Sequence, residues 1–198
     1  IKRSCLFIRK ILLTNVLIVG VGNIGGRHLQ SLALINEEIT IWIVEPDNNS
    51  IEKAKKLFGT MPPNKNITSL KYFDSLNRIN ENIDIAIIAT KSDIRREIIE
   101  DMLELINVKY VIMEKVLFQK IQDYHHISNL FKQKNIKGWV NCPLRTFDIY
   151  KEIKNNVKDS QIVAINVTGG SNIGLGCNSI HYLDLASYFS SSVNYRIK

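Results

Sequence analysis

The stretch NVLIVGVGNIG, residues 15–25, decides the fold. An aliphatic run is followed by three glycines at the spacing G-x-G-x-x-G, and residues with helical periodicity come next. In this context the first glycine allows a tight turn, the second lets the backbone approach a pyrophosphate, and the third lets strand and helix pack closely. The start of the helix offers N–H groups and a partial positive charge to phosphate oxygens. We therefore predict a dinucleotide site at Gly20, Gly22, Asn23, Ile24 and Gly25.

An acidic residue after the next apolar run indicates which dinucleotide binds. Glu45 follows the run 39–44, at about the distance expected for a carboxylate that accepts hydrogen bonds from the ribose hydroxyls. A carboxylate there would repel a 2′-phosphate, so the sequence favours NAD, with NADP less favoured. Asp47 is a competing candidate for the same position.

Short apolar runs alternate with segments of helical periodicity up to residue 142. The predicted strands are 15–19, 39–44, 83–89, 109–113 and 138–141, with a weaker one near 69–73. The predicted helices are 24–35, 50–58, 93–106 and 121–133. Strands that read as continuously apolar are typical of a sheet covered on both faces. The expected fold class is α/β, a doubly wound parallel Rossmann sheet over residues 15–142, preceded by an irregular leader at 1–14.

The composition changes after residue 142, where Pro143 breaks the apolar run. The pattern then predicts a helix at 147–157, a strand at 161–167, a glycine-rich loop and a helix at 180–189. One strand cannot form a sheet alone, because its backbone groups would stay unpaired. We therefore expect residues 143–198 to be an incomplete α+β domain for substrate and dimerisation, either truncated or completed by a partner chain in a homo-oligomer.

Composition excludes several classes of protein. The net charge is +7, but the 26 Lys and Arg residues are spread over predicted helices and are not interleaved with aromatic residues, which argues against a nucleic-acid partner. No apolar run approaches the roughly 20 residues that a membrane span needs. Three cysteines without close pairing suggest neither a disulfide framework nor a zinc site. A cytoplasmic protein that does not bind membranes is expected.

Four further segments occur in the order found in the Gfo/Idh/MocA oxidoreductase family, which the sequence resembles over nearly its whole length. Residues 89–95, ATKSDIR, are similar to the A-T-P-x-x-x-H turn, with Lys91 and Arg95 in place of proline and histidine. Residues 114–116, EKV, are similar to E-K-P without its proline. NCPLR at 141–145 is similar to the N-x-R segment. NSIHYLD at 178–184 is similar to the N-x-x-H-x-x-D form of members that act on nucleotide-linked sugars.

The resemblance implies roles for three residues in the first part of the chain. Lys115 is implied to be the active-site lysine beside the nicotinamide, at the carboxyl end of a central strand, where ligands of open α/β sheets bind. An ammonium group there can hydrogen-bond the reacting oxygen and stabilise the charge that develops on it. Thr90 and Glu114 are implied to contact the cofactor.

The last predicted helix carries the other implied catalytic residue. His181 and Asp184 are three residues apart and so lie on one helix face. Histidine titrates near neutrality, which makes His181 the natural general base, while Asp184 would orient it or bind the sugar. Arg145 and Asn178 are implied to contact substrate. We predict no metal, because a third ligand is lacking. The remaining histidines are interpreted as structural or solvated: His28, His125 and His126.

Two hypotheses follow from the sequence. The first is an NAD-dependent oxidoreductase that transfers a hydride between nicotinamide and a sugar hydroxyl or keto group, most simply of a nucleotide-linked sugar used in polysaccharide biosynthesis. The second is a shortened, non-catalytic relative that binds the dinucleotide. Turnover of a keto-sugar, as opposed to binding alone, separates them.

Overall fold

The structure is a computed structural model that describes residues 13–157, 165–169 and 174–192. The chain divides into two compact units, Ile1–Trp139 and Val140–Lys198. The predicted domain boundary after Cys142 lies just beyond this division. Of the predicted leader at 1–14, residues 1–12 lie outside the described residues.

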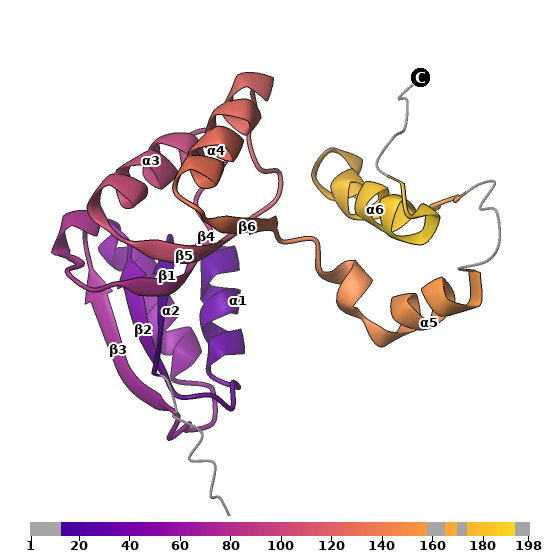
Figure 1. Cartoon of the computed structure of the whole chain (residues 1–198). Coiled ribbons are helices and arrows are strands. Elements are labelled where there is room, and N and C mark those ends of the chain that lie inside the picture. Colours follow the sequence, from indigo (N-terminus) through magenta and orange to yellow (C-terminus); the bar gives the residue numbers. More distant parts are fainter. Residues whose placement is uncertain (1–12, 158–164, 170–173, 193–198) are drawn as a thin grey trace, which may run out of the picture. The chain divides into compact units, whose positions relative to one another are not determined.

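A six-stranded sheet forms the centre of the first unit (Figure 1). Its strands are β1 (Thr14–Val19), β2 (Ile39–Val44), β3 (Ile67–Phe73), β4 (Ile83–Ile88), β5 (Val108–Met113) and β6 (Lys137–Val140). Their order across the sheet is β3-β2-β1-β4-β5-β6, and β1–β2, β1–β4, β2–β3 and β4–β5 are parallel pairs. This is the doubly wound dinucleotide-binding order, and it confirms the predicted fold class.

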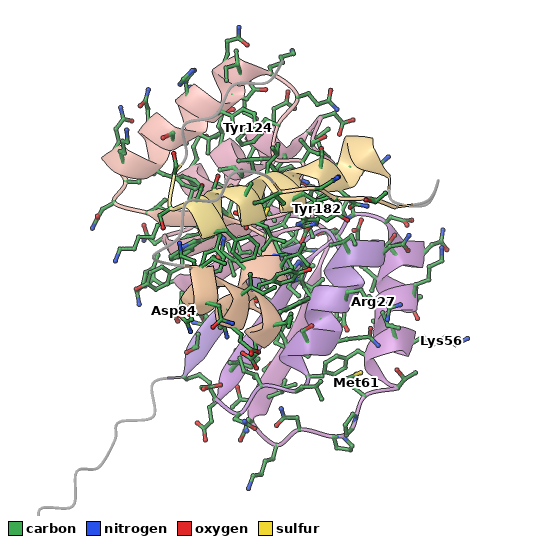
Figure 2. All side chains as sticks on the ribbon, turned by 90° about the vertical axis from the view of Figure 1, so that its right-hand side faces the viewer. Arg27, Lys56, Met61, Asp84, Tyr124 and Tyr182 are labelled. Atoms are coloured by element: carbon green, nitrogen blue, oxygen red, sulfur yellow. The ribbon has the colours of Figure 1, made fainter. Side chains whose placement is uncertain are left out.

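Helices cover both faces of the sheet (Figure 1). One face packs against α1 (Asn23–Leu32) and α2 (Asn48–Phe58), and the other against the short η1 (Leu76–Arg78), α3 (Arg95–Leu105) and α4 (Ile121–Gln133). All six residues of β2 are therefore buried, as a continuously apolar strand requires. The outer faces of α1 and α2 are polar, and Arg27 and Lys56 point into solvent from them (Figure 2).

The helix and strand ends have identifiable local causes. Asp47 begins α2, because its carboxylate accepts hydrogen bonds from the backbone N–H groups of Asn49 and Ser50. The predicted helix 93–106 begins later, at Arg95, because residues 92–94 form a turn. The other strands of the first unit begin or end within two residues of their predicted ranges.

The second unit contains helices in its described residues. After η2 (Pro143–Thr146) these are α5 (Asp148–Val157) and α6 (Leu175–Ser190). The strand predicted at 161–167 is wrong for residues 165–167, which have no regular structure, and residues 161–164 lie outside the described residues. The last helix begins five residues before its predicted start at 180, directly after Gly174, which has a left-handed φ of 60°. None of the described helices combines the length and hydropathy needed to cross a bilayer.

Candidate active site

The carboxyl ends of the central strands meet at one edge of the sheet. In the strand register Val19 pairs with Val44 and Ile88, and Ile88 pairs with Met113. The residues that follow these strands therefore leave the sheet side by side: Gly20, Glu45, Ala89 and Glu114. Ligands of open α/β sheets bind at this edge, beside the point where the strand order reverses between β1 and β4.

The glycine loop has the geometry that the sequence predicts. Gly20 has a φ of 87°, and a Cβ atom there would lie 3.2 Å from the backbone nitrogen of Thr90. At Gly25 a Cβ atom would lie 1.9 Å from the Gly20 carbonyl oxygen, so no side chain fits. A Cβ atom at Gly22, in contrast, would meet nothing within 4 Å. The loop is closed against the protein at Gly25 and open toward the sheet edge at Gly22, where a ligand can approach.

The first two residues of α1 are exposed, and the helix has no side-chain cap at this end. Gly22 is the N-cap residue and offers no capping oxygen, and Asn23 and Ile24 are exposed. The first backbone N–H groups of a helix have no carbonyl partner within the helix, so they attract an anion. Asn23 and Ile24 were predicted to contact the cofactor; both are exposed at this end of the helix, and their contact with a pyrophosphate stays a prediction.

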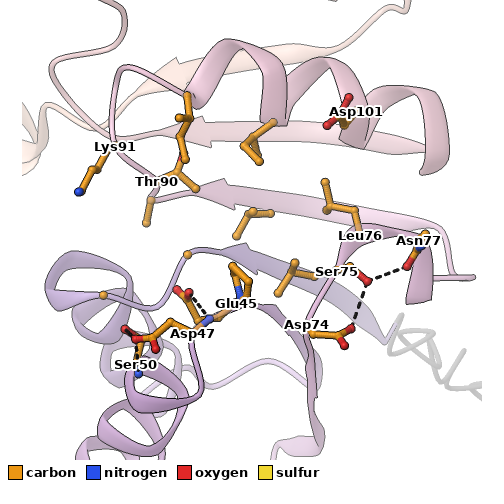
Figure 3. Close-up of a pocket in the computed structure, with 18 of the residues that line it drawn as sticks. Glu45, Asp47, Ser50, Asp74, Ser75, Leu76, Asn77, Thr90, Lys91 and Asp101 are labelled. Carbon is orange, nitrogen blue, oxygen red and sulfur yellow. Dashed lines mark hydrogen bonds between the residues drawn. The ribbon is translucent and has the colours of Figure 1, made fainter.

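The structure separates the two acidic candidates for the ribose. Glu45 directs its carboxylate to the glycine loop, where Oε2 accepts a hydrogen bond from Val21 N at 3.0 Å. Its Oε1 accepts a hydrogen bond from Asp47 N at 3.0 Å (Figure 3). Asp47 is occupied as the cap of α2, where hydrogen bonds from the hydroxyl and backbone of Ser50 lower the pKa of its carboxyl group. Glu45 therefore faces the glycine loop, while Asp47 is committed to the start of α2.

A cleft of about 820 Å³ extends along this edge from the glycine loop to α3 (Figure 3). Its apolar wall comes from both sides of the sheet edge and includes Val19, Val44, Leu76, Ile94 and Ile98. Its rim is mostly acidic and hydroxylated, with Lys91 on the opposite side from Glu45. An aromatic base fits between such apolar walls, while a ribose and a pyrophosphate fit the polar end near the glycines.

Thr90 supplies an independent test of whether a cofactor fits. Its Oγ1 atom is buried, and no described residue hydrogen-bonds it. A buried hydroxyl group without a partner costs free energy, and such groups in native proteins call for an explanation such as a ligand. Because Thr90 also lines the cleft, the open loop at Gly22 and this hydroxyl together fit a dinucleotide.

The segment after β5 carries Lys115 and is held by two helices. From α1, His28 places Nε2 2.7 Å from Oε1 of Glu114. From α3, the buried Arg95 donates to the carbonyl oxygens of Glu114 and of the residues after Lys115. Lys115 itself is half-buried, and the bond between it and Val116 is a cis peptide.

Sequence reasoning missed the parts that His28 and Arg95 play. His28 was interpreted as structural or solvated, and its contact with the carboxylate of Glu114, next to Lys115, is a structural role whose partner the sequence did not reveal. The available signal was its spacing: His28 follows Gly25 by three residues, so both lie on the helix face that packs against the sheet. Arg95 was noted only as a departure from the family's histidine. Its burial and its contacts with backbone carbonyl oxygens have no signal in the sequence.

The other predicted site residues belong to the second unit. On α6, His181, Asn178 and Asp184 are half-buried. Arg145 in η2 binds Asp184 with two donors: Nε lies 2.7 Å from Oδ2, and Nη2 contacts Oδ1. Two of the three side chains that were predicted to contact substrate, Arg145 and Asp184, therefore bind each other. The ion pair packs η2 against α6.

Within the described ranges, no three His, Cys, Asp or Glu side chains are grouped closely enough to hold a metal ion.

Comparisons with known proteins agree with this geometry. Residues 14–142 match the model of the Gfo/Idh/MocA family, described as an oxidoreductase family with an NAD-binding Rossmann fold. Similar solved structures include scyllo-inositol dehydrogenase from Lactobacillus casei with bound NAD(H) and scyllo-inositol, and myo-inositol 2-dehydrogenase from Lactobacillus plantarum. Each is 19% identical to the chain, with a TM-score of 0.68, over 91% of this chain.

The chain spans 57% of the length of either inositol dehydrogenase. At 19% identity these likenesses show the fold alone. No curated protein sequence matches the chain.

Proposed function

The chain belongs to the Gfo/Idh/MocA oxidoreductase family, with its NAD-binding Rossmann fold, and on that premise we propose that it transfers a hydride between NAD and a hydroxyl or keto group on a polyhydroxylated ring. The observation that carries the proposal is the cleft, which leads from the open glycine loop past Glu45 and Thr90 along the edge of the sheet that also carries Lys115. NAD supplies the hydride acceptor when it is bound there.

The residues predicted from the sequence to form the site can be given the following tasks. The N–H groups that begin α1 bind the pyrophosphate, and Glu45 accepts hydrogen bonds from the ribose hydroxyls. The Lys115 ammonium group hydrogen-bonds the substrate oxygen and stabilises the negative charge that grows on it. His181 takes the hydroxyl proton as the hydride leaves the same carbon, and Asp184, Asn178 and Arg145 fix the ring.

The substrate class has two candidates. The inositol dehydrogenases with the same fold act on cyclic polyols, which supports an unmodified ring carrying several hydroxyl groups. The segment 178–184 supports a nucleotide-linked sugar instead. A polyol would need only hydrogen-bonding side chains around it, whereas a nucleotide diphosphate would also need cations, and Arg145 is the one predicted for that part.

The experiment is a panel assay of NAD reduction. Purified protein is incubated with NAD and either scyllo-inositol, myo-inositol or a set of uridine-diphosphate sugars, and NADH is followed by absorbance. Lys115→Met and His181→Asn, each expected to lose at least about a hundredfold in kcat, serve as matched controls for the chemistry. Reduction of NAD that survives in both variants would contradict the assigned roles.

A second candidate is a protein that binds NAD without turnover. One observation favours it: the charged groups of Arg145 and Asp184 bind each other, so neither is directed to a substrate. In that case NADH would bind with the expected preference over NADPH, and no member of the panel would be oxidised.

A further inference from the structure

The guanidinium group of Arg95 contacts four backbone carbonyl oxygens from two separate loops. Nη1 lies 2.5 Å from the oxygen of Glu114, 2.7 Å from that of Val116 and 2.8 Å from that of Leu117. Nη2 donates to the carbonyl oxygen of Thr90. The three acceptors after β5 lie on both sides of Lys115, and the fourth belongs to a residue that lines the dinucleotide cleft.

This arrangement is costly, so it is not explained by stability alone. Arg95 is 2% exposed, and burial lowers the pKa of its guanidinium group, although the charge of Glu114 opposes that shift. It lies in the first turn of α3, where the helix dipole disfavours a cation. Its buried Nε–H group has no acceptor among the described residues. An apolar side chain would avoid all three costs.

The contacts, by contrast, are specific in their geometry. A guanidinium group is a rigid, planar set of donors, so it fixes the acceptors relative to one another as well as to α3. A lysine ammonium group at the same site is a single point on a flexible chain and cannot span carbonyl groups from two loops.

We propose that Arg95 is a positioning residue, which holds the backbone on both sides of Lys115 at a fixed place relative to the cleft wall at Thr90. This inference rests on the function proposed above, because Lys115 is the group whose placement matters. Arg95 touches neither cofactor nor substrate; it acts through the segment Glu114–Leu117. Misplacing a reacting group by about 1 Å can cost about a hundredfold in rate.

Arg96 provides a matched control. It follows Arg95 on the same helix, but its side chain is 42% exposed and its partners are the carboxylates of Glu100 and Asp123. We compare Arg95→Lys and Arg95→Gln with Arg96→Lys and Arg96→Gln in the full chain. Each is measured for NADH affinity by fluorescence titration, for kcat and KM with NAD and scyllo-inositol or myo-inositol, and for the labelling rate of Lys115 by trinitrobenzenesulfonate, quantified by peptide mass spectrometry.

The Arg95 variants are expected to bind NADH within about threefold of the wild type and to lose about a hundredfold in kcat, while labelling of Lys115 becomes about tenfold faster. The Arg96 variants should match the wild type in all three measurements. If the wild type turns over neither inositol, the proposed function fails for these substrates, and Lys115 labelling still decides the role of Arg95. Labelling and kcat equal to those of the Arg96 variants would overturn the proposal. So would Arg95 variants that fail to fold, because they would assign Arg95 to stability.

Discussion

His28 and Glu114 join the helix that begins at the glycine loop to the strand end that precedes Lys115. His28 Nε2 lies 2.7 Å from Glu114 Oε1, and only 8% of the Glu114 side chain is exposed. A carboxylate buried to this extent requires hydrogen-bond donors, and an imidazole from α1 is one of them.

The contact between His28 and Glu114 should stabilise the fold. His28→Ala removes a donor from a nearly buried carboxylate and should lower the free energy of unfolding by about 1–3 kcal/mol, measured by urea denaturation. His126→Ala is the control, because the side chains of His126 and Glu100 are 47% and 26% exposed, and their ion pair should contribute less than about 1 kcal/mol. Equal losses in the two variants would contradict the role assigned to His28.

Two glycines of the same loop predict opposite phenotypes. Gly25→Ala forces a methyl group to within 1.9 Å of the Gly20 carbonyl oxygen and should destabilise the fold by about 1–3 kcal/mol or more. Gly22→Ala places its methyl group in open space, so thermal unfolding should be unchanged while NADH affinity falls at least about tenfold. If Gly22→Ala bound NADH like the wild type, the pyrophosphate would have to lie elsewhere.

Substitution of Glu45 should change the selectivity between NADH and NADPH, whereas substitution of Asp47 should change the stability of the fold. Glu45→Gln removes the charge that faces the ribose and should shift the NADPH-to-NADH affinity ratio toward NADPH by about tenfold in a fluorescence titration. Asp47→Ala removes the cap of α2 and should cost about 0.5–2 kcal/mol of stability with no change in that ratio. The reverse outcome would make Asp47 the selective residue.

Arg145 and Asp184 predict energetic coupling within the second unit. Their side chains are 41% and 19% exposed, so a double-mutant cycle of Arg145→Ala and Asp184→Ala should give a coupling of about 0.5–1 kcal/mol in unfolding experiments. Coupling near zero would indicate that Arg145 leaves Asp184 in solution and is available to a substrate.

Local patterns were sufficient for the sheet and the cofactor loop. β2 and α4 have the predicted bounds, because a buried parallel strand reads as continuously apolar and an amphipathic helix repeats its apolar positions. The glycine spacing likewise predicted which loop positions tolerate no side chain. In the structure Gly20 and Gly25 are crowded by neighbouring atoms, and Gly22 faces open space.

Contacts between distant residues could not be read in the same way. The Arg95 guanidinium group reaches carbonyl oxygens about twenty positions along the chain, and backbone acceptors have no sequence signature. The strand predicted at 161–167 relied on β-propensity alone, which depends on neighbouring strands, and residues 165–167 did not form one. The roles of Lys115 and His181 stay predictions, because Lys115 belongs to the first unit and His181 to the second, and no distance between the two residues is defined.

Isothermal titration calorimetry of the folded protein with NAD, NADH, NADP and NADPH tests the central claim most directly. The cleft and the open glycine loop predict one site per chain for NAD and NADH, with NADP and NADPH at least about tenfold weaker because of the carboxylate of Glu45. The absence of binding heat with all four dinucleotides would contradict the account.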